Sequence, residues 1–94
     1  MTVAELLSDE SKWTRHFYAR DSKGQCVNPE EPEAVSWCLV GALTKCYGRE
    51  PPFTSFKYQK VRNLIKAISN HQVIAYNDSH TYEEIMEIVR KAGV

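Results

Sequence analysis

The chain contains a cysteine, a histidine and an asparagine–aspartate pair in an order that could form a catalytic triad. Cys38 could act as a nucleophile and His71 as its general base. Asn77 or Asp78 could then orient the histidine. A reactive cysteine needs a lowered pKa, which a helix N-terminus or a nearby cation provides. Cys38 instead lies in an apolar stripe beyond an acidic stretch, so we expect a buried and inert thiol that packs in the core.

A second candidate site consists of Asn77, Asp78 and His80, just before the last predicted helix. Such a group could form a polar pocket for catalysis or for binding. Asparagine and aspartate also form turns, because their side chains hydrogen-bond to the local backbone. We expect a structural turn here, and we retain its three polar residues as candidates for partner binding.

A third candidate is a basic surface on a helix that the sequence predicts over residues 53–69. Four basic residues gather on one side of this helix: Lys57, Lys60, Arg62 and Lys66. No acidic residue occurs between Pro51 and Asn77, whereas the first 34 residues carry seven acidic and four basic residues. The charges are therefore segregated along the chain. The basic side is a candidate surface for an acidic protein or for nucleic-acid phosphates.

The bulk composition argues against several classes of function. The 94 residues have a formal net charge of zero, whereas a general nucleic-acid binder usually carries a strongly basic balance. The chain has only four glycines and they are scattered, so it lacks a glycine-rich phosphate loop.

The cysteines Cys26, Cys38 and Cys46 form no C-x-x-C pair, and no H-x-x-x-H pair occurs, so we expect no metal site and no cofactor. Their odd number and wide spacing indicate reduced thiols, which predicts a cytoplasmic protein. The first residues are acidic where a signal peptide is basic. The longest apolar run, residues 37–43, is far shorter than the ~20 residues that span a bilayer, so we expect no membrane association.

The elements that must position these residues centre on a buried helix predicted over residues 34–47. Apolar side chains recur there at helical spacing, at Val35, Cys38, Leu39, Ala42, Leu43 and Cys46. Further apolar residues lie on the other side, and a helix that is apolar nearly all round is buried. Glycine costs ~1 kcal/mol relative to alanine inside a helix, so Gly41 implies that a neighbouring element approaches the backbone closely.

A small β-hairpin is predicted near the N-terminus. Residues 13–19 alternate between apolar and polar side chains, and residues 25–27 could form the returning strand. Residues 21–24, Asp-Ser-Lys-Gly, are typical of a type I turn followed by a left-handed glycine.

The second half contains a linker at 50–52, the basic helix, and an apolar segment at 73–76 that could be extended and closed by the Asn77–Asp78 turn. Helix starts are marked by capping boxes. Thr2 with Glu5 predicts a short first helix, and Thr81 with Glu84 predicts the last helix, which Gly93 ends.

These elements predict a mainly helical α+β fold, in which about four helices surround the central helix 34–47 and a small hairpin lies near the N-terminus. The length of 94 residues is typical of one domain, 1–94.

The sequence also resembles a family of small bacterial and phage proteins known only as a domain of unknown function. The family pattern is A-V-x-W-C-x-x-G-A-L, followed later by an aromatic-Asn-Asp motif, a threonine and a final helix. The matching residues are Ala34, Val35, Trp37, Cys38, Gly41, Ala42, Leu43, Tyr76, Asn77, Asp78, Thr81 and Glu84. The family usually has tryptophan where this chain has Tyr76. The resemblance covers residues 13–92, although residues 49–70 match only in being helical, and it implies a shared fold without an activity.

We therefore expect a non-enzymatic, cytosolic or phage-encoded accessory protein that binds another protein, in an oligomeric state that the sequence leaves open. One alternative is a small cysteine- or histidine-dependent hydrolase or transferase. The other is nucleic-acid binding through the basic helix 53–69.

Overall fold

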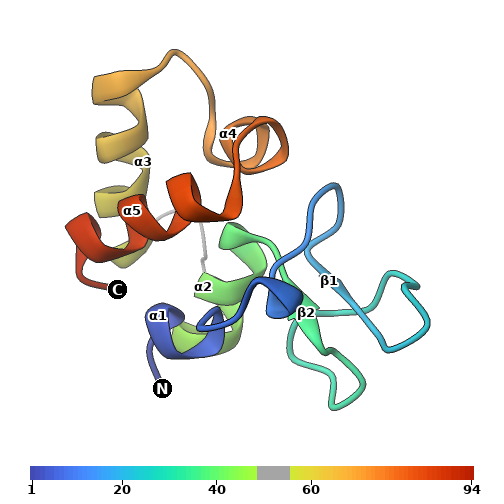
Figure 1. Cartoon of the computed structure of the whole chain (residues 1–94). Coiled ribbons are helices and arrows are strands. Elements are labelled where there is room, and N and C mark those ends of the chain that lie inside the picture. The colour runs from blue at the N-terminus through green and yellow to red at the C-terminus, as the bar shows by residue number, and fades with distance from the viewer. Residues whose placement is uncertain (49–55) are drawn as a thin grey trace.

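The computed structural model describes residues 1–48 and 56–94 and has a mainly helical α+β fold, as predicted (Figure 1). The elements in chain order are α1 (Val3–Leu6), a 3-10 turn (Glu10–Lys12), β1 (Ala19–Arg20), β2 (Ser36–Trp37), α2 (Leu39–Tyr47), α3 (Phe56–Ile68), α4 (Val73–Ser79) and α5 (Tyr82–Ala92). The predicted linker at 50–52 and the predicted first residues of the basic helix, 53–55, lie outside the described residues.

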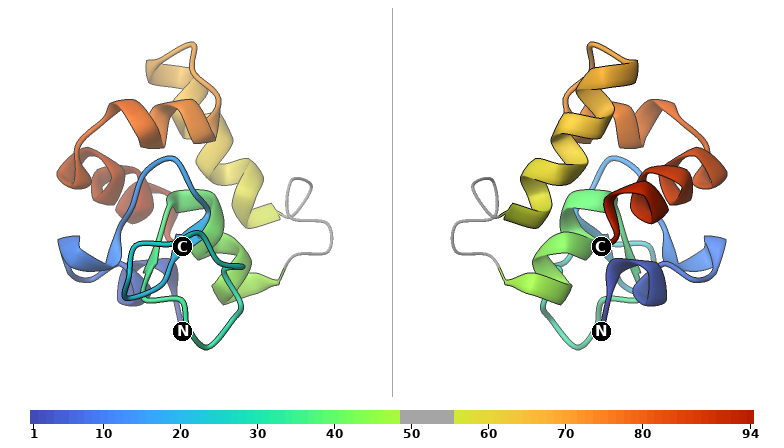
Figure 2. Two further views of the ribbon diagram at one scale, coloured as in Figure 1. Left: turned by 90° about the vertical axis from the view of Figure 1, so that its right-hand side faces the viewer. Right: turned by 90° about the vertical axis from the view of Figure 1, so that its left-hand side faces the viewer.

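Helix α2 occupies the middle of the fold, because it packs against α1, α3, α4 and β2. Its residues from Leu39 to Thr44 are all buried. One apolar cluster contains side chains from every α-helix and every strand of the described residues. Figures 1 and 2 show α3, α4 and α5 grouped on one side of α2, with α1 and the strands on the other. No helix in the described parts of the chain is both long and apolar enough to cross a membrane.

The predicted start of the central helix at residue 34 is wrong. Residues 36–37 form β2, and Cys38 has the extended backbone of an N-cap residue, with φ −78° and ψ 175°. Val35, which was assigned to the buried stripe, is 46% exposed. The N–H groups of Val35 and Cys38 bond to the carbonyls of Arg20 and Tyr18, at 2.8 and 3.1 Å. Pairing with a distant segment therefore outweighs the local helical spacing.

The predicted antiparallel sheet near the N-terminus is present, but its pairing differs from the prediction. Strand β1 pairs with β2, so that Ala19 faces Trp37. The expected returning strand at 25–27 contributes only a single bridge between Arg20 and Cys26. The predicted turn at 21–24 is confirmed, since the Gly24 N–H donates to the Asp21 carbonyl at 3.0 Å and Gly24 has φ +80°.

The predicted extended segment at 73–76 and the turn at 77–78 are wrong, because both lie within α4. The buried residues of α4 are Val73, Tyr76 and Asn77, which is the i, i+3, i+4 spacing of one helical face. An extended strand would instead have placed Val73 and Ala75 on one side. Packing against α2 and α3 thus overrides the β preference of the Val-Ile pair.

The predicted capping boxes are confirmed at both ends of the chain. Thr2 and Glu5 cap α1, and Thr81 and Glu84 cap α5, with the Thr81 N–H donating to Glu84 Oε1 at 2.9 Å. Gly93 ends α5 in the left-handed conformation, as predicted. The N and C termini lie close together in Figure 2, and the N–H of Ala4 donates to the carbonyl of Val94 at 3.3 Å.

Candidate functional site

Asn77 forms a buried hydrogen-bonding centre between three parts of the chain, and its side chain is only 1% exposed. Its Oδ1 accepts from Trp13 Nε1 at 2.8 Å and from the Leu39 N–H at 3.0 Å. Its Nδ2 donates to the Thr14 carbonyl and to Asp78 Oδ1, each at 3.1 Å. These four bonds use the full capacity of the amide. Asn77 therefore joins α4, α2 and the segment before β1, and a partner cannot contact it.

Asp78 holds a strained residue in place. Its Oδ1 accepts from the backbone N–H of His16 at 2.9 Å, and its Oδ2 lies 3.6 Å from His16 Nδ1. His16 has φ +74°, a conformation that residues other than glycine rarely adopt. The Asp78 carboxylate thus fixes the loop that leads into β1.

Cys38 caps the first turn of α2, since its Sγ accepts from the Gly41 N–H at 3.3 Å. The side chain is buried, as the sequence predicted, although its place at the helix start was not foreseen. Burial raises the pKa of Cys38 to about 11, and the Asp78 carboxylate adds to this rise against the effect of backbone N–H donors. The thiol is therefore neutral at physiological pH and a weak nucleophile.

A shallow and mainly apolar pocket of about 330 Å³ opens beside Cys38. It is lined by His16, Phe17, Tyr18, Cys26, Cys38, Ile74 and Asp78. The predicted base His71 does not line it. His71 lies between α3 and α4, with its Nδ1 2.9 Å from the hydroxyl of Ser69. The structure therefore brings Cys38 and Asp78 together, and it supplies His16 in place of His71.

Sequence reasoning missed His16 as a neighbour of Asp78. The two residues are 62 positions apart, and His16 was assigned to a hairpin strand. The Asn-Asp motif was the available signal. It indicates that two polar side chains need hydrogen-bonding partners, but it does not identify the partner residues.

His80 is fixed at the end of α4. Its ring stacks on Tyr76 with centroids 3.7 Å apart, and its Nδ1 lies 2.9 Å from the Tyr76 carbonyl. The His80 carbonyl accepts from the guanidinium of Arg15. His80 is half-buried, so only part of its ring remains available to a partner.

The basic side chains of α3 are all exposed, and we call Lys57, Lys60, Arg62 and Lys66 together the basic face. Lys57 and Lys60 lie on the flank near α2 and α5, and Arg62 and Lys66 lie on the opposite flank, near the start of α4. Lys57 lies 4.6 Å above the Tyr47 ring, and Lys60 lies 5.6 Å above the Phe56 ring. Among the residues that the structure describes, the ion pairs are His16–Asp78, Glu87–Arg90 and Glu87–Lys91, and none of them includes the basic face.

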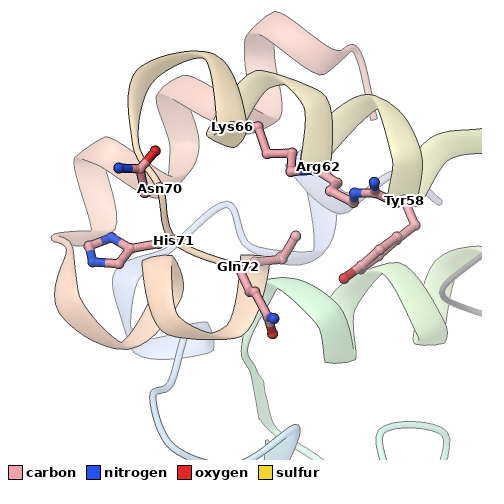
Figure 3. Close-up of a pocket in the computed structure, with 7 residues that line it drawn as sticks. Tyr58, Arg62, Lys66, Asn70, His71 and Gln72 are labelled. Atoms are coloured by element: carbon pink, nitrogen blue, oxygen red, sulfur yellow. The ribbon is translucent and has the colours of Figure 1, made fainter.

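A second pocket, of about 470 Å³, lies between α3 and the start of α4 and contains part of the basic face (Figure 3). We call it the α3–α4 pocket. Its lining residues are Tyr58, Arg62, Lys66, Asn70, His71, Gln72 and Val73. Residues 1–48 and 56–94 contain no group of three or more His, Cys, Asp or Glu side chains placed to hold a metal ion.

The comparison with known families gives one match. A family described as "Family of unknown function (DUF6197)" matches residues 2–93 of the chain. The comparisons find no match among curated proteins or solved structures. Because the family match covers nearly the whole chain, this protein belongs to the family of unknown function DUF6197.

Proposed function

We propose that this protein is a non-enzymatic accessory protein that binds an acidic region of another protein through the basic face of α3. The observation that carries the proposal is a set of four exposed cations that no carboxylate among the described residues neutralises. Complementary charge steers association and selects the partner. Free thiols at all three cysteines support a cytoplasmic location, and the family resemblance supports a bacterial or phage origin.

A protein partner is favoured over nucleic acid for two reasons. The formal net charge is zero, and the first 34 residues are net acidic, so the whole molecule does not attract a polyanion from a distance. The helix of the basic face also exposes large apolar side chains, with Phe56 76% and Ile68 62% exposed. Aromatic side chains and arginine are enriched in protein–protein interfaces.

The alternative of a cysteine-dependent hydrolase or transferase has one observation in its favour. Cys38 caps a helix and lines one pocket with His16 and Asp78. However, burial raises the pKa of Cys38 to about 11, so the thiol is protonated at pH 7. A binding role therefore accounts for the arrangement better than nucleophilic catalysis does.

The proposal can be tested by reversing charge on the part of the basic face that lies outside the α3–α4 pocket. We expect the Lys57→Glu/Lys60→Glu variant to lose a partner that the wild-type protein captures from nuclease-treated bacterial lysate, as identified by mass spectrometry. The matched control is Lys12→Glu/Lys23→Glu, which makes the same charge change at two exposed lysines elsewhere. The control should retain the partner.

Equal capture by both variants, or equal loss in both, would contradict the proposal. Fluorescence anisotropy with DNA and RNA oligonucleotides measures the competing function. Tight binding that disappears in Lys57→Glu/Lys60→Glu would favour nucleic acid over a protein partner.

A further inference from the structure

We propose that the α3–α4 pocket binds a phosphate monoester group. This inference deepens the proposed function and rests on it, because Arg62 and Lys66 belong to the basic face. It adds that the acidic ligand presents a compact dianion, carried either by a phosphorylated side chain of the partner or by a small phosphorylated molecule.

The first argument is the unbalanced charge of the pocket. Arg62 and Lys66 are four positions apart on α3, so they are neighbours on the same helical face. Figure 3 shows both side chains extending along α3 at the edge of the pocket. None of the residues that line the pocket is acidic. Like charges at this spacing repel each other, and an anion between them would convert repulsion into attraction.

The second argument is the floor of the pocket. Val73 and Tyr58 line it and are almost completely buried, at 1% and 8% exposed. Figure 3 shows Tyr58 reaching from α3 towards α4 on the side of the pocket opposite Asn70 and His71. Val73 and the Tyr58 ring exclude water from one side of the pocket, whereas Arg62, Lys66, Asn70, His71 and Gln72 are exposed, so ionic hydrogen bonds there are strengthened on that one side only.

The third argument is the supply of neutral hydrogen-bond donors opposite the cations. Gln72 occupies the N-cap position of α4, but its side chain makes no capping bond. Asn70 lies beside it in the loop between the two helices. Figure 3 shows both carboxamides pointing away from Arg62 and Lys66, so each side chain must turn towards the cations before it donates an N–H group to a ligand held there.

A phosphate monoester fits this combination better than a carboxylate or a nucleic-acid strand. It carries a charge near −2 and three terminal oxygens, which can accept from a guanidinium fork, an ammonium and an amide together. A carboxylate offers one charge and two oxygens. A strand of nucleic acid gains affinity from many phosphates in a row, whereas this pocket combines only two fixed cations with its amides.

The test is an NMR titration of the full chain at constant ionic strength, with inorganic phosphate and O-phosphoserine as probes and with chloride and serine as controls. We expect saturable shifts of the backbone amides at Asn70 and Gln72. Arg62→Gln should weaken binding about tenfold, or about 1.4 kcal/mol, because the ligand loses an ionic hydrogen bond. Lys66→Gln should weaken binding several-fold, and Lys60→Gln, which lies outside the pocket, should not change it.

Chemical shifts that grow linearly with phosphate concentration would contradict a phosphate site in the α3–α4 pocket. An equal loss of phosphate affinity in Lys60→Gln and Arg62→Gln would contradict it too. Stronger binding of single-stranded RNA than of O-phosphoserine would overturn it as well.

Phosphatase treatment of the lysate separates the two sources of the phosphate. Loss of the captured partner supports a phosphorylated protein, and unchanged capture with saturable O-phosphoserine binding supports a small phosphorylated molecule.

The same experiments separate this inference from the function on which it rests. Lys57→Glu/Lys60→Glu should abolish partner capture but leave the phosphate-induced shifts in place. If no partner is captured while phosphate still saturates the pocket, the proposed function is wrong and phosphate binding in the pocket is supported. If the partner is captured through Lys57 and Lys60 but phosphate does not bind, phosphate binding in the pocket is contradicted and the proposed function is supported.

Discussion

The side-chain oxygen of Asn77 accepts the backbone N–H of Leu39 at 3.0 Å, so a residue of α4 caps the first turn of α2 from 38 positions away. The first N–H groups of a helix have no partner within that helix. At α2 two of these groups have side-chain acceptors: the Leu39 N–H donates to Asn77 and the Gly41 N–H donates to the sulfur of Cys38. The Trp-Cys and Asn-Asp motifs of the sequence therefore meet at one helix end.

The first prediction concerns Asn77. Replacing it by alanine should lower the free energy of unfolding by about 2–4 kcal/mol, because Trp13 Nε1 and the Leu39 N–H lose their buried acceptor. Urea denaturation followed by tryptophan fluorescence measures the change. Asn63→Ala, at an exposed position of α3, is the matched control and should change stability by less than about 0.5 kcal/mol. Similar stability of the two variants would contradict the central role of Asn77.

The second prediction concerns Asp78, for which a structural role and a binding role predict opposite results. Asp78→Ala should lower stability by about 1.5–3 kcal/mol, since it removes the acceptor of the His16 N–H. Asp78→Asn should lose less stability, because its amide oxygen can still accept the His16 N–H. Partner capture per folded molecule should stay unchanged in both variants. Full stability together with lost capture would instead identify Asp78 as a binding residue.

A third prediction follows from the raised pKa of Cys38. The folded thiol has a pKa of about 11 against an ordinary value of 9.0, so the unfolded chain loses this proton first as pH rises. The stabilising contribution is complete below about pH 9 and is lost between about pH 9 and pH 11. Unfolding free energy should therefore fall by about 2–3 kcal/mol more in wild type than in Cys38→Ala over that range.

Thiol labelling provides a second measurement on the same residue. Iodoacetamide at pH 8 should modify exposed Cys26 rapidly and leave buried Cys38 unmodified while the fold persists. Rapid modification of Cys38 in the native protein would contradict an inert thiol and support the hydrolase alternative. At neutral pH, Cys38→Ala should lower stability by about 1–2 kcal/mol, because a small core group and a helix cap are lost.

Features that depend on neighbouring residues could be predicted from the sequence. The capping boxes at Thr2 and Thr81, the turn that ends at Gly24 and the terminal Gly93 each need only a few adjacent positions. The mainly helical class also followed from local periodicity. The burial of Cys38 was predicted correctly because apolar residues surround it in the sequence, whether the chain there is helical or extended.

The errors occur where a distant segment decides the local conformation. Residues 35–38 have helical spacing but instead pair in an extended conformation with the chain around Tyr18 and Arg20. Residues 73–76 have β-forming side chains but become helical against α2 and α3. For the same reason the His16–Asp78 contact could not be predicted, since one sequence does not reveal which polar groups meet across 62 positions.

The last prediction concerns Gly41, where close packing reverses the usual effect of an alanine substitution. In most helix interiors, replacing glycine by alanine stabilises the protein by up to ~1 kcal/mol. A Cβ atom on Gly41, however, would overlap the carbonyl oxygen of Tyr18, which also accepts the Cys38 N–H at 3.1 Å. Because that oxygen belongs to the backbone and is already bonded, the loop or α2 must move to make room.

We therefore expect Gly41→Ala to lower the free energy of unfolding by about 1–3 kcal/mol, and Gly41→Leu to be less stable still or unfolded. A thermal melt followed by circular dichroism measures both variants, with Asn63→Ala again as the helix control. Amide hydrogen exchange in Gly41→Ala should accelerate first at Cys38, whose bond to Tyr18 must give way. A melting temperature equal to or above that of wild type would mean that the chain around Tyr18 does not pack against α2 as described.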